Sequence, residues 1–173
     1  MTATSHTTLN DVDIATVGGL AQAIADNPDR GATRWAASVE WRGGFRSQAS
    51  IREFGPLDSD EPRGLGGTDT APNPVEQLLA ALGNCLAVGF AANASAAGVE
   101  LGHLRLDVEG DLDLHTFLGL RPGHAGFDAI RVTVHIESDA SPDQIEELRQ
   151  RVVRTSPVGH TLERAIPVSY AIA

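Results

Sequence analysis

The residue of this chain with the most reactive type of side chain is Cys85, the one cysteine among 173 residues. It lies inside a run of twenty-three residues, between Glu76 and Glu100, that carries no charge. As a thiolate, a cysteine can attack a peroxide or a disulfide, but a free thiol is mostly protonated at neutral pH and needs a nearby cation or dipole to become reactive. The surroundings of Cys85 therefore decide between a reactive thiol and an inert buried one.

The charge-free run predicts one long helix, from Pro74 to about Ala97, with a length of roughly 36 Å. Asn73 stands at the N-cap, Glu76 where a capping box has its acid, and Gly98 where a helix commonly ends. The run is long enough to span a bilayer, but its polar residues and the lack of flanking basic residues favour a buried helix of a soluble protein.

Cys85 is predicted to lie about three turns beyond the start of this helix. The helix dipole fades within the first turn, so a reactive thiol at this place needs a cation from another segment. The neighbours of Cys85 on the helix surface are apolar or small, which also suits an inert cysteine at a close helix crossing. Both interpretations stay open from the residues alone. These neighbours are Leu78, Ala81, Leu82, Val88, Gly89 and Ala92.

The elements that must position these residues form an α+β chain. Its strands are indicated by alternating apolar and polar residues, and two of its helices are predicted to begin at a Ser-Pro pair. We predict an N-terminal tail over residues 1–30, which contains a weak helix at about residues 13–26, and a single domain over residues 31–173. The domain is expected to contain a hairpin (33–41 and 45–53), a long loop (54–72), the long helix, a second hairpin (104–114 and 130–136), two helices (142–154 and 157–164) and a closing strand (166–172).

Composition excludes several classes of partner. A formal net charge of −10 disfavours nucleic acid and anionic membranes, which are bound through basic patches. No signal peptide is evident and a lone cysteine cannot form an internal disulfide, so a cytoplasmic protein is expected. The six histidines show no metal-ligand spacing, and no motif predicts a cofactor.

Two motifs carry a resemblance to a known family. Residues 73–85 and the run Thr155-Ser156-Pro157-Val158, followed by Ile166-Pro167-Val168, resemble the OsmC/Ohr family of osmotically inducible and organic hydroperoxide resistance proteins. The resemblance covers about residues 35–173. It implies an OsmC-like fold, in which an intertwined homodimer wraps hairpin-based sheets around two long central helices. It also implies two thiol sites near the subunit interface.

The activity implied by this resemblance is an antioxidant stress response, in which a helix thiolate reduces organic hydroperoxides. Cys85 matches that catalytic residue. Ser156 stands where the family has a second cysteine. An intramolecular disulfide with Cys85, which completes the family's catalytic cycle, therefore cannot form in this chain. A one-cysteine peroxidase regenerated by an external thiol is the function that we predict. The alternative is a non-catalytic protein that binds a small apolar ligand at the dimer interface.

The resemblance also implies two charged residues that act on the thiol, an arginine from the first hairpin and a glutamate at the start of the long helix. Arg46 is the nearest match for the arginine, with Arg42 as the second choice, and Glu76 matches the acid. Nine residues at about 100° each place Glu76 on the side of the helix opposite Cys85. Glu76 could therefore serve the thiol of the partner, or act only as a helix cap.

Overall fold

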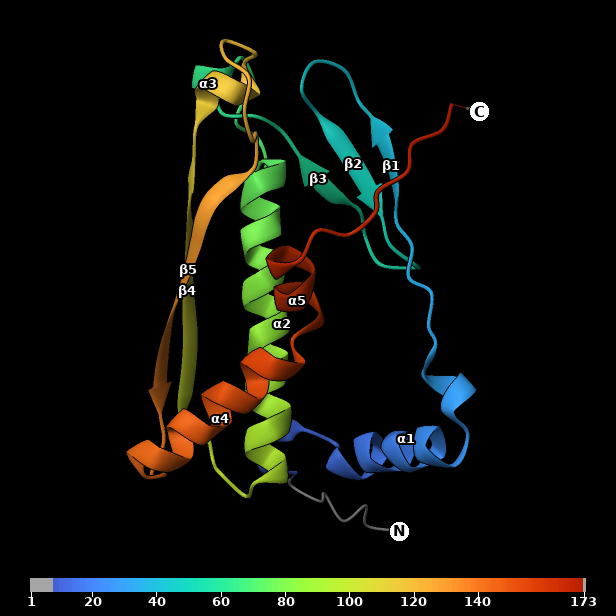
Figure 1. The fold of residues 1–173 in the computed structure, drawn as a ribbon, viewed down its shortest axis with the longest axis vertical. Coiled ribbons are helices and arrows are strands. Elements are labelled where there is room, and N and C mark those ends of the chain that lie inside the picture. Colours follow the sequence, from blue (N-terminus) through green and yellow to red (C-terminus); the bar gives the residue numbers. More distant parts are fainter. Residues whose placement is uncertain (1–7, 173) are drawn as a thin grey trace. The chain divides into compact units, whose positions relative to one another are not determined.

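The computed structural model describes residues 8–172, so the first seven residues of the predicted tail and the last residue of the chain lie outside it (Figure 1). The chain forms two compact units, one of residues 1–15 and 79–173 and one of residues 16–78. The long helix α2, Pro74–Ala96, begins in the second unit and continues in the first. Its bounds and its capping residue confirm the predicted helix.

The second unit contains a three-stranded antiparallel sheet of β1 (Ser38–Trp41), β2 (Ser47–Ser50) and β3 (Leu57–Ser59), in that order. Gly43 and Gly44 join β1 to β2 at φ values of 90° and 60°, which glycine adopts without strain. The predicted hairpin is confirmed, but its strands are shorter than predicted, since residues 33–37 and 51–53 lie outside them. The prediction that residues 54–72 form only a loop was wrong at β3, because three residues are too few to show an alternation. The unit also holds most of α1 (Ile14–Asp26) and the short turns η2 (Pro28–Gly31) and η3 (Arg63–Leu65).

A buried carboxylate organises the loop between β3 and α2. Asp60 is 1% exposed, and its Oδ2 accepts hydrogen bonds from the backbone and the hydroxyl groups of Thr68 and Thr70. Its Oδ1 accepts the backbone N–H of Glu61 at 2.8 Å. These donors, the Thr68 hydroxyl above all, hold the pKa of Asp60 well below its usual value of 3.8. The ionised carboxylate therefore holds together the two ends of the loop that leads into α2, at Glu61 and at Thr68 and Thr70.

We expect Asp60→Asn to lower the Tm, because an amide placed among these donors turns its own N–H₂ towards at least one of them. The control is Asp69→Asn, an exposed position in the same loop at φ 59°, a value that Asn tolerates. Because the folded pKa of Asp60 is lowered, its stabilisation is complete above about pH 4 and is lost as the pH falls through the folded value. The Tm of the variant should therefore fall less between pH 5 and pH 2 than that of the wild type. An equal Tm for the two variants at pH 7 would contradict the role of Asp60.

The first unit is built on a long antiparallel ribbon of β4 (His103–Leu112) and β5 (Phe127–Glu137), joined by the short helix α3 (Leu114–Phe117). The second predicted hairpin is confirmed, except that Leu114 begins α3 instead of ending the strand. The ribbon's outer face carries cross-strand ion pairs, with Arg131 bonded to Glu109 and Asp111, and His135 bonded to Asp107. The two helices that follow, α4 (Pro142–Thr155) and α5 (Pro157–Glu163), also agree with the prediction.

The core of the first unit lies between α2, the inner face of the ribbon and α4 (Figure 1). Residues spaced by four along α2 fall on one face, and this stripe is the buried part of the helix. Gly89 lets α4 approach closely, since a Cβ at this position would lie 2.9 Å from Val152 Cγ1. The buried apolar residues are Leu82, Leu86, Phe90, Ala94, Val99, Leu148 and Val152.

The N-terminal segment is fastened to the far end of α2 by Asn10. Its side chain donates to Ser95 Oγ at 3.0 Å and to the Val99 carbonyl at 2.9 Å, and it accepts the Leu101 N–H at 2.8 Å. Asn10 has φ 54°, in the left-handed region that Asn tolerates better than most residues. One side chain thus satisfies groups on both sides of the turn that follows the helix.

Much of α2 stays exposed in the single chain, with Val88 70% and Leu78 39% exposed. By length and composition, α2 could cross a membrane, a test that the core helix of a soluble protein also passes. The four buried residues of α2 belong to a core shared with α4 and the ribbon, which favours the core helix.

The predicted closing strand over residues 166–172 was wrong for the single chain, since these residues lie in neither sheet. The apolar residues of this segment are exposed, with Val168 at 62% and Tyr170 at 91%. An alternating pattern predicts a strand, but a strand forms only where another strand pairs with it.

Candidate functional site

Cys85 and Ser156 meet at the contact between α2 and the junction of α4 with α5. Cys85 Sγ lies 3.3 Å from Ser156 Oγ, and Ser156 is only 5% exposed. Ser156 ends α4 and caps α5, and its Oγ accepts the backbone N–H of Gly159 at 3.0 Å. The Ser-Pro step that predicted the start of α5 therefore also fixes the hydroxyl beside the thiol.

Gly159 leaves room for Ser156 in this arrangement. A Cβ at position 159 would lie 3.0 Å from Ser156 Oγ and 3.2 Å from Ser156 Cβ, which is tighter than ordinary packing. A larger residue would require Ser156 to shift by a few tenths of an ångström.

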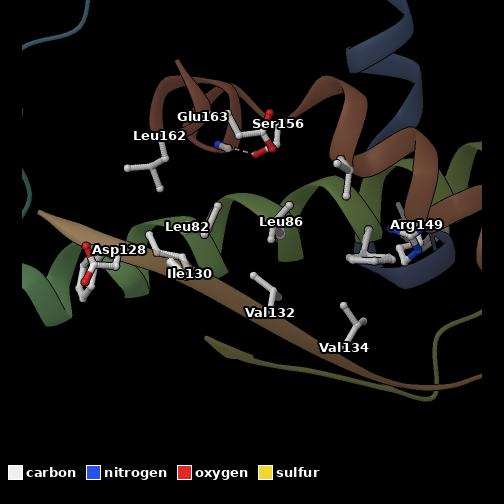
Figure 2. A pocket seen from close by; sticks show the side chains of 15 residues that line it. Leu82, Leu86, Asp128, Ile130, Val132, Val134, Arg149, Ser156, Leu162 and Glu163 are labelled. Carbon is white, nitrogen blue, oxygen red and sulfur yellow. Dashed lines mark hydrogen bonds between the residues drawn. The ribbon is translucent and has the colours of Figure 1, made fainter. Parts of the chain in front are cut away.

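An apolar pocket of about 380 Å³ borders Ser156 (Figure 2). In Figure 2, Leu82 and Leu86 of α2 lie between Ser156 and the β5 residues Ile130 and Val132. The volume and the apolar lining are typical of a site for a small organic molecule. The full lining consists of Leu82, Leu86, Phe90, Phe127, Asp128, Ala129, Ile130, Val132, Val134, Arg149, Val153, Ser156, Gly159, Leu162 and Glu163.

Two polar groups of the pocket, Asp128 and Arg149, lie at its opposite ends, and Ser156 and Glu163 lie together between them (Figure 2). Arg149 forms two bonds to Glu146, at 2.6 and 2.7 Å, and this pair lowers the pKa of Glu146 to about 2 and raises that of Arg149. The guanidinium is therefore already paired, and most of the lining residues are apolar, although Asp128, Ser156 and Glu163 add polar groups.

Glu76 acts as a helix cap in this structure. Its carboxylate accepts the Asn73 backbone N–H at 2.9 Å, while Asn73 Oδ1 accepts the Glu76 N–H at 2.9 Å. This is the complete capping box that the sequence predicts.

The two candidate arginines differ in their pairing. Arg42 forms a salt bridge of 2.8 Å with Glu40 and also bonds Gln48. Arg46 is exposed and donates one long bond, of 3.4 Å, to the Gly43 carbonyl. Among the described residues, Arg46 pairs with no carboxylate, so it is the arginine more available to a thiolate.

The predicted site residues fall in different units. Cys85 and Ser156 are brought together in the first unit, whereas Arg46 and Glu76 belong to the second. Their grouping around one thiol stays a prediction. Within residues 8–172, no group of three His, Cys, Asp or Glu side chains is placed to hold a metal ion. The pocket could not be predicted from the sequence, because its lining comes from four separate segments whose apolar residues look like ordinary core.

The long thiol-bearing helix, the antiparallel ribbon and the capped Ser-Pro junction define an OsmC-like fold. The chain belongs to the OsmC family, since residues 67–171 match the family model described as OsmC-like protein. No sequence among the curated proteins matches this chain.

Solved structures of the same fold come from several bacteria. The OsmC-like protein of Mycoplasma pneumoniae has a TM-score of 0.66 at 21% identity, covering 76% of this chain and 88% of that chain. An organic hydroperoxide resistance protein OsmC of Legionella pneumophila has a TM-score of 0.56 at 19% identity, covering 76% and 91%. A putative organic hydroperoxide resistance protein of Vibrio cholerae, with captopril in one of its active sites, has a TM-score of 0.56 at 19% identity, covering 76% and 86%. At these identities the likeness shows the fold.

Proposed function

We propose that this protein reduces organic hydroperoxides through Cys85, as a one-cysteine peroxidase of the OsmC family that an external thiol regenerates. The observation that carries the proposal is the contact of the Cys85 thiol with Ser156, a residue that lines the apolar pocket, although Cys85 itself is not part of the lining. Family membership supports a peroxide-resistance role, and the pocket suits the organic part of a hydroperoxide. Such a protein belongs in the cytoplasm, where thiol reductants are abundant.

The reaction has two stages. The Cys85 thiolate attacks the terminal peroxide oxygen, so that an S–O bond forms, the O–O bond breaks and the alcohol leaves with a proton. The sulfur is oxidised by two electrons to a sulfenic acid. A low-molecular-weight or protein thiol then condenses with the sulfenic acid, releasing water and leaving a mixed disulfide, and a second thiol frees Cys85.

In this proposal Arg46 supplies the cation that favours the thiolate, and Glu76 is the acid that orients the arginine. The absence of a carboxylate partner for Arg46 among the described residues supports its choice over Arg42. Glu76 can combine the two roles, because only its Oε2 bonds to Asn73 and a carboxylate accepts several hydrogen bonds.

The test is to treat the reduced protein with one equivalent of cumene hydroperoxide in the absence of other thiols. Cumyl alcohol should appear in equal amount, and Cys85 should become reactive to dimedone, a trap for sulfenic acid. Adding a dithiol should restore the free thiol. If the hydroperoxide is unchanged and Cys85 stays a free thiol, the peroxidase function is wrong.

A second candidate function is the binding of a small apolar molecule without redox chemistry, favoured by the pocket and by Ser156 in place of a second cysteine. If that function holds, a long-chain alcohol that cannot be reduced should raise the Tm, while hydroperoxides of the same length are bound but not consumed.

We further propose that the protein is a homodimer, whose partner covers the exposed apolar surfaces of the single chain. These surfaces include Trp35 (82% exposed), Trp41 (76%), Val88 (70%) and Tyr170 (91%). Isolated large apolar side chains are common on protein surfaces, but so many on one small chain mark an interaction site.

Sedimentation velocity at micromolar concentration should give a mass near twice the chain mass of 18.2 kDa. The dimer should persist on dilution to nanomolar concentration, because an interface of this kind is expected to be large and apolar. A stable folded monomer would contradict the homodimer.

A further inference from the structure

We propose that Ser156 acts on Cys85 as a fixed hydrogen-bond donor, which stabilises the negatively charged and oxidised forms of the sulfur. The observation is the contact of 3.3 Å between Ser156 Oγ and Cys85 Sγ. The part of this inference that concerns oxidation rests on the proposed peroxidase function, whereas the part that concerns the thiolate does not.

The direction of the hydrogen bond follows from the other partner of the serine. Ser156 Oγ accepts the backbone N–H of Gly159, which occupies one lone pair and leaves the hydroxyl proton free. A neutral thiol could be donor or acceptor in the contact with Oγ. A thiolate has no proton, so Ser156 must then be the donor, and its bond favours the charged sulfur.

The hydroxyl is held before any charge develops on sulfur. Ser156 is 5% exposed, lies at the junction of α4 and α5, and its Oγ is held by the backbone N–H of Gly159 at 3.0 Å. A donor that is already oriented stabilises a developing charge more than one that must first reorient. Serine at this position is therefore more than an inert replacement for a cysteine.

The same donor would act on the oxidised sulfur. Once Cys85 has become a sulfenic acid, this chain has no second cysteine that could condense with it. The Ser156 hydroxyl, which cannot form a bond to sulfur under these conditions, can still donate to the new oxygen. The sulfenic acid should consequently persist until an external thiol arrives.

The test is the rate of alkylation of Cys85 by iodoacetamide, measured from pH 5 to pH 9. Ser156→Ala should react at least about tenfold more slowly at pH 7, the effect of one charge-assisted hydrogen bond, and its rate should rise at higher pH than in the wild type. Ser156→Thr keeps the hydroxyl and should recover most of the rate. An alanine variant that reacts as fast as the wild type, or faster, would overturn the inference.

Ser141→Ala is the matched control, because Ser141 caps α4 by a bond of 3.3 Å to the Gln144 N–H and is exposed, away from any cysteine contact. It removes a cap of the same kind and should leave the alkylation rate unchanged. If it slows alkylation as much as Ser156→Ala, the effect comes from general stability and the inference is wrong.

Dimedone trapping after one equivalent of cumene hydroperoxide separates the two proposals. If Ser156→Ala slows alkylation but neither protein forms a sulfenic acid, the donor role stands and the peroxidase function fails. If the wild type forms a sulfenic acid but Ser156→Ala is alkylated at the same rate, the peroxidase function stands and the donor role fails. If both proposals are correct, the sulfenic acid of Ser156→Ala should decay several-fold faster than that of the wild type.

Discussion

Cys85→Ser is expected to abolish hydroperoxide consumption while leaving the Tm within about 3 °C of the wild type. A hydroxyl is a far weaker nucleophile than a thiolate and cannot form a sulfenic acid, so no turnover should remain above the uncatalysed rate. The fold should persist because serine is nearly the same size as cysteine. Its hydroxyl also finds a partner, since Ser156 Oγ lies 3.3 Å from the present sulfur.

The measurement is the residual concentration of cumene hydroperoxide after incubation with protein and excess dithiol, with the Tm read from the same samples. Residual consumption in the variant above a few per cent of the wild-type rate would mean that the chemistry does not use Cys85. A large fall in Tm, together with no activity in the wild type, would instead identify Cys85 as a packing residue.

Ser156→Cys is expected to form a disulfide with Cys85 after one equivalent of hydroperoxide. The two side-chain atoms already lie 3.3 Å apart, and a disulfide bond of about 2.05 Å requires them to approach by roughly 1 Å. The new thiol should condense with the sulfenic acid, so dimedone labelling should disappear and turnover with a dithiol should rise.

The oxidised variant should also be more stable. The crosslink joins residues separated by 71 positions, for which loop-closure entropy gives about 4 kcal/mol and a Tm increase of roughly 10 °C. Ser156→Ala, which loses the same cap but cannot crosslink, is the control. Two free thiols after peroxide treatment, with Cys85 unoxidised, would show that Cys85 does not react with peroxide and would favour the binding function.

The sequence was sufficient to predict elements whose signals are local. The bounds of α2 follow from Asn73 and Glu76 at its start and Gly98 at its end, and the structure forms these caps. The start of α5 follows from the Ser156-Pro157 step in the same way. Such signals involve neighbours within four residues, so they hold whatever the rest of the chain does.

Features that depend on distant segments could not be predicted. The closeness of Cys85 and Ser156 followed only from a family resemblance, because nothing in their spacing of 71 residues implies a contact. The pocket requires the relative placement of α2, β5 and α4. The prediction of a strand over residues 166–172 was wrong. An alternating pattern indicates an apolar face, but it does not show whether another strand is present to pair with it.

The attachment of Asn10 sets a practical limit on how the chain can be shortened or fused. Its three hydrogen bonds satisfy groups at the end of α2 and in the turn after it, so removing residues up to position 10 would leave these groups without their partner. A purification tag attached ahead of this residue should leave the bonds intact, because Asn10 itself is kept. Any truncation intended to isolate the OsmC-like core should therefore keep Asn10, even though the family match begins only at residue 67.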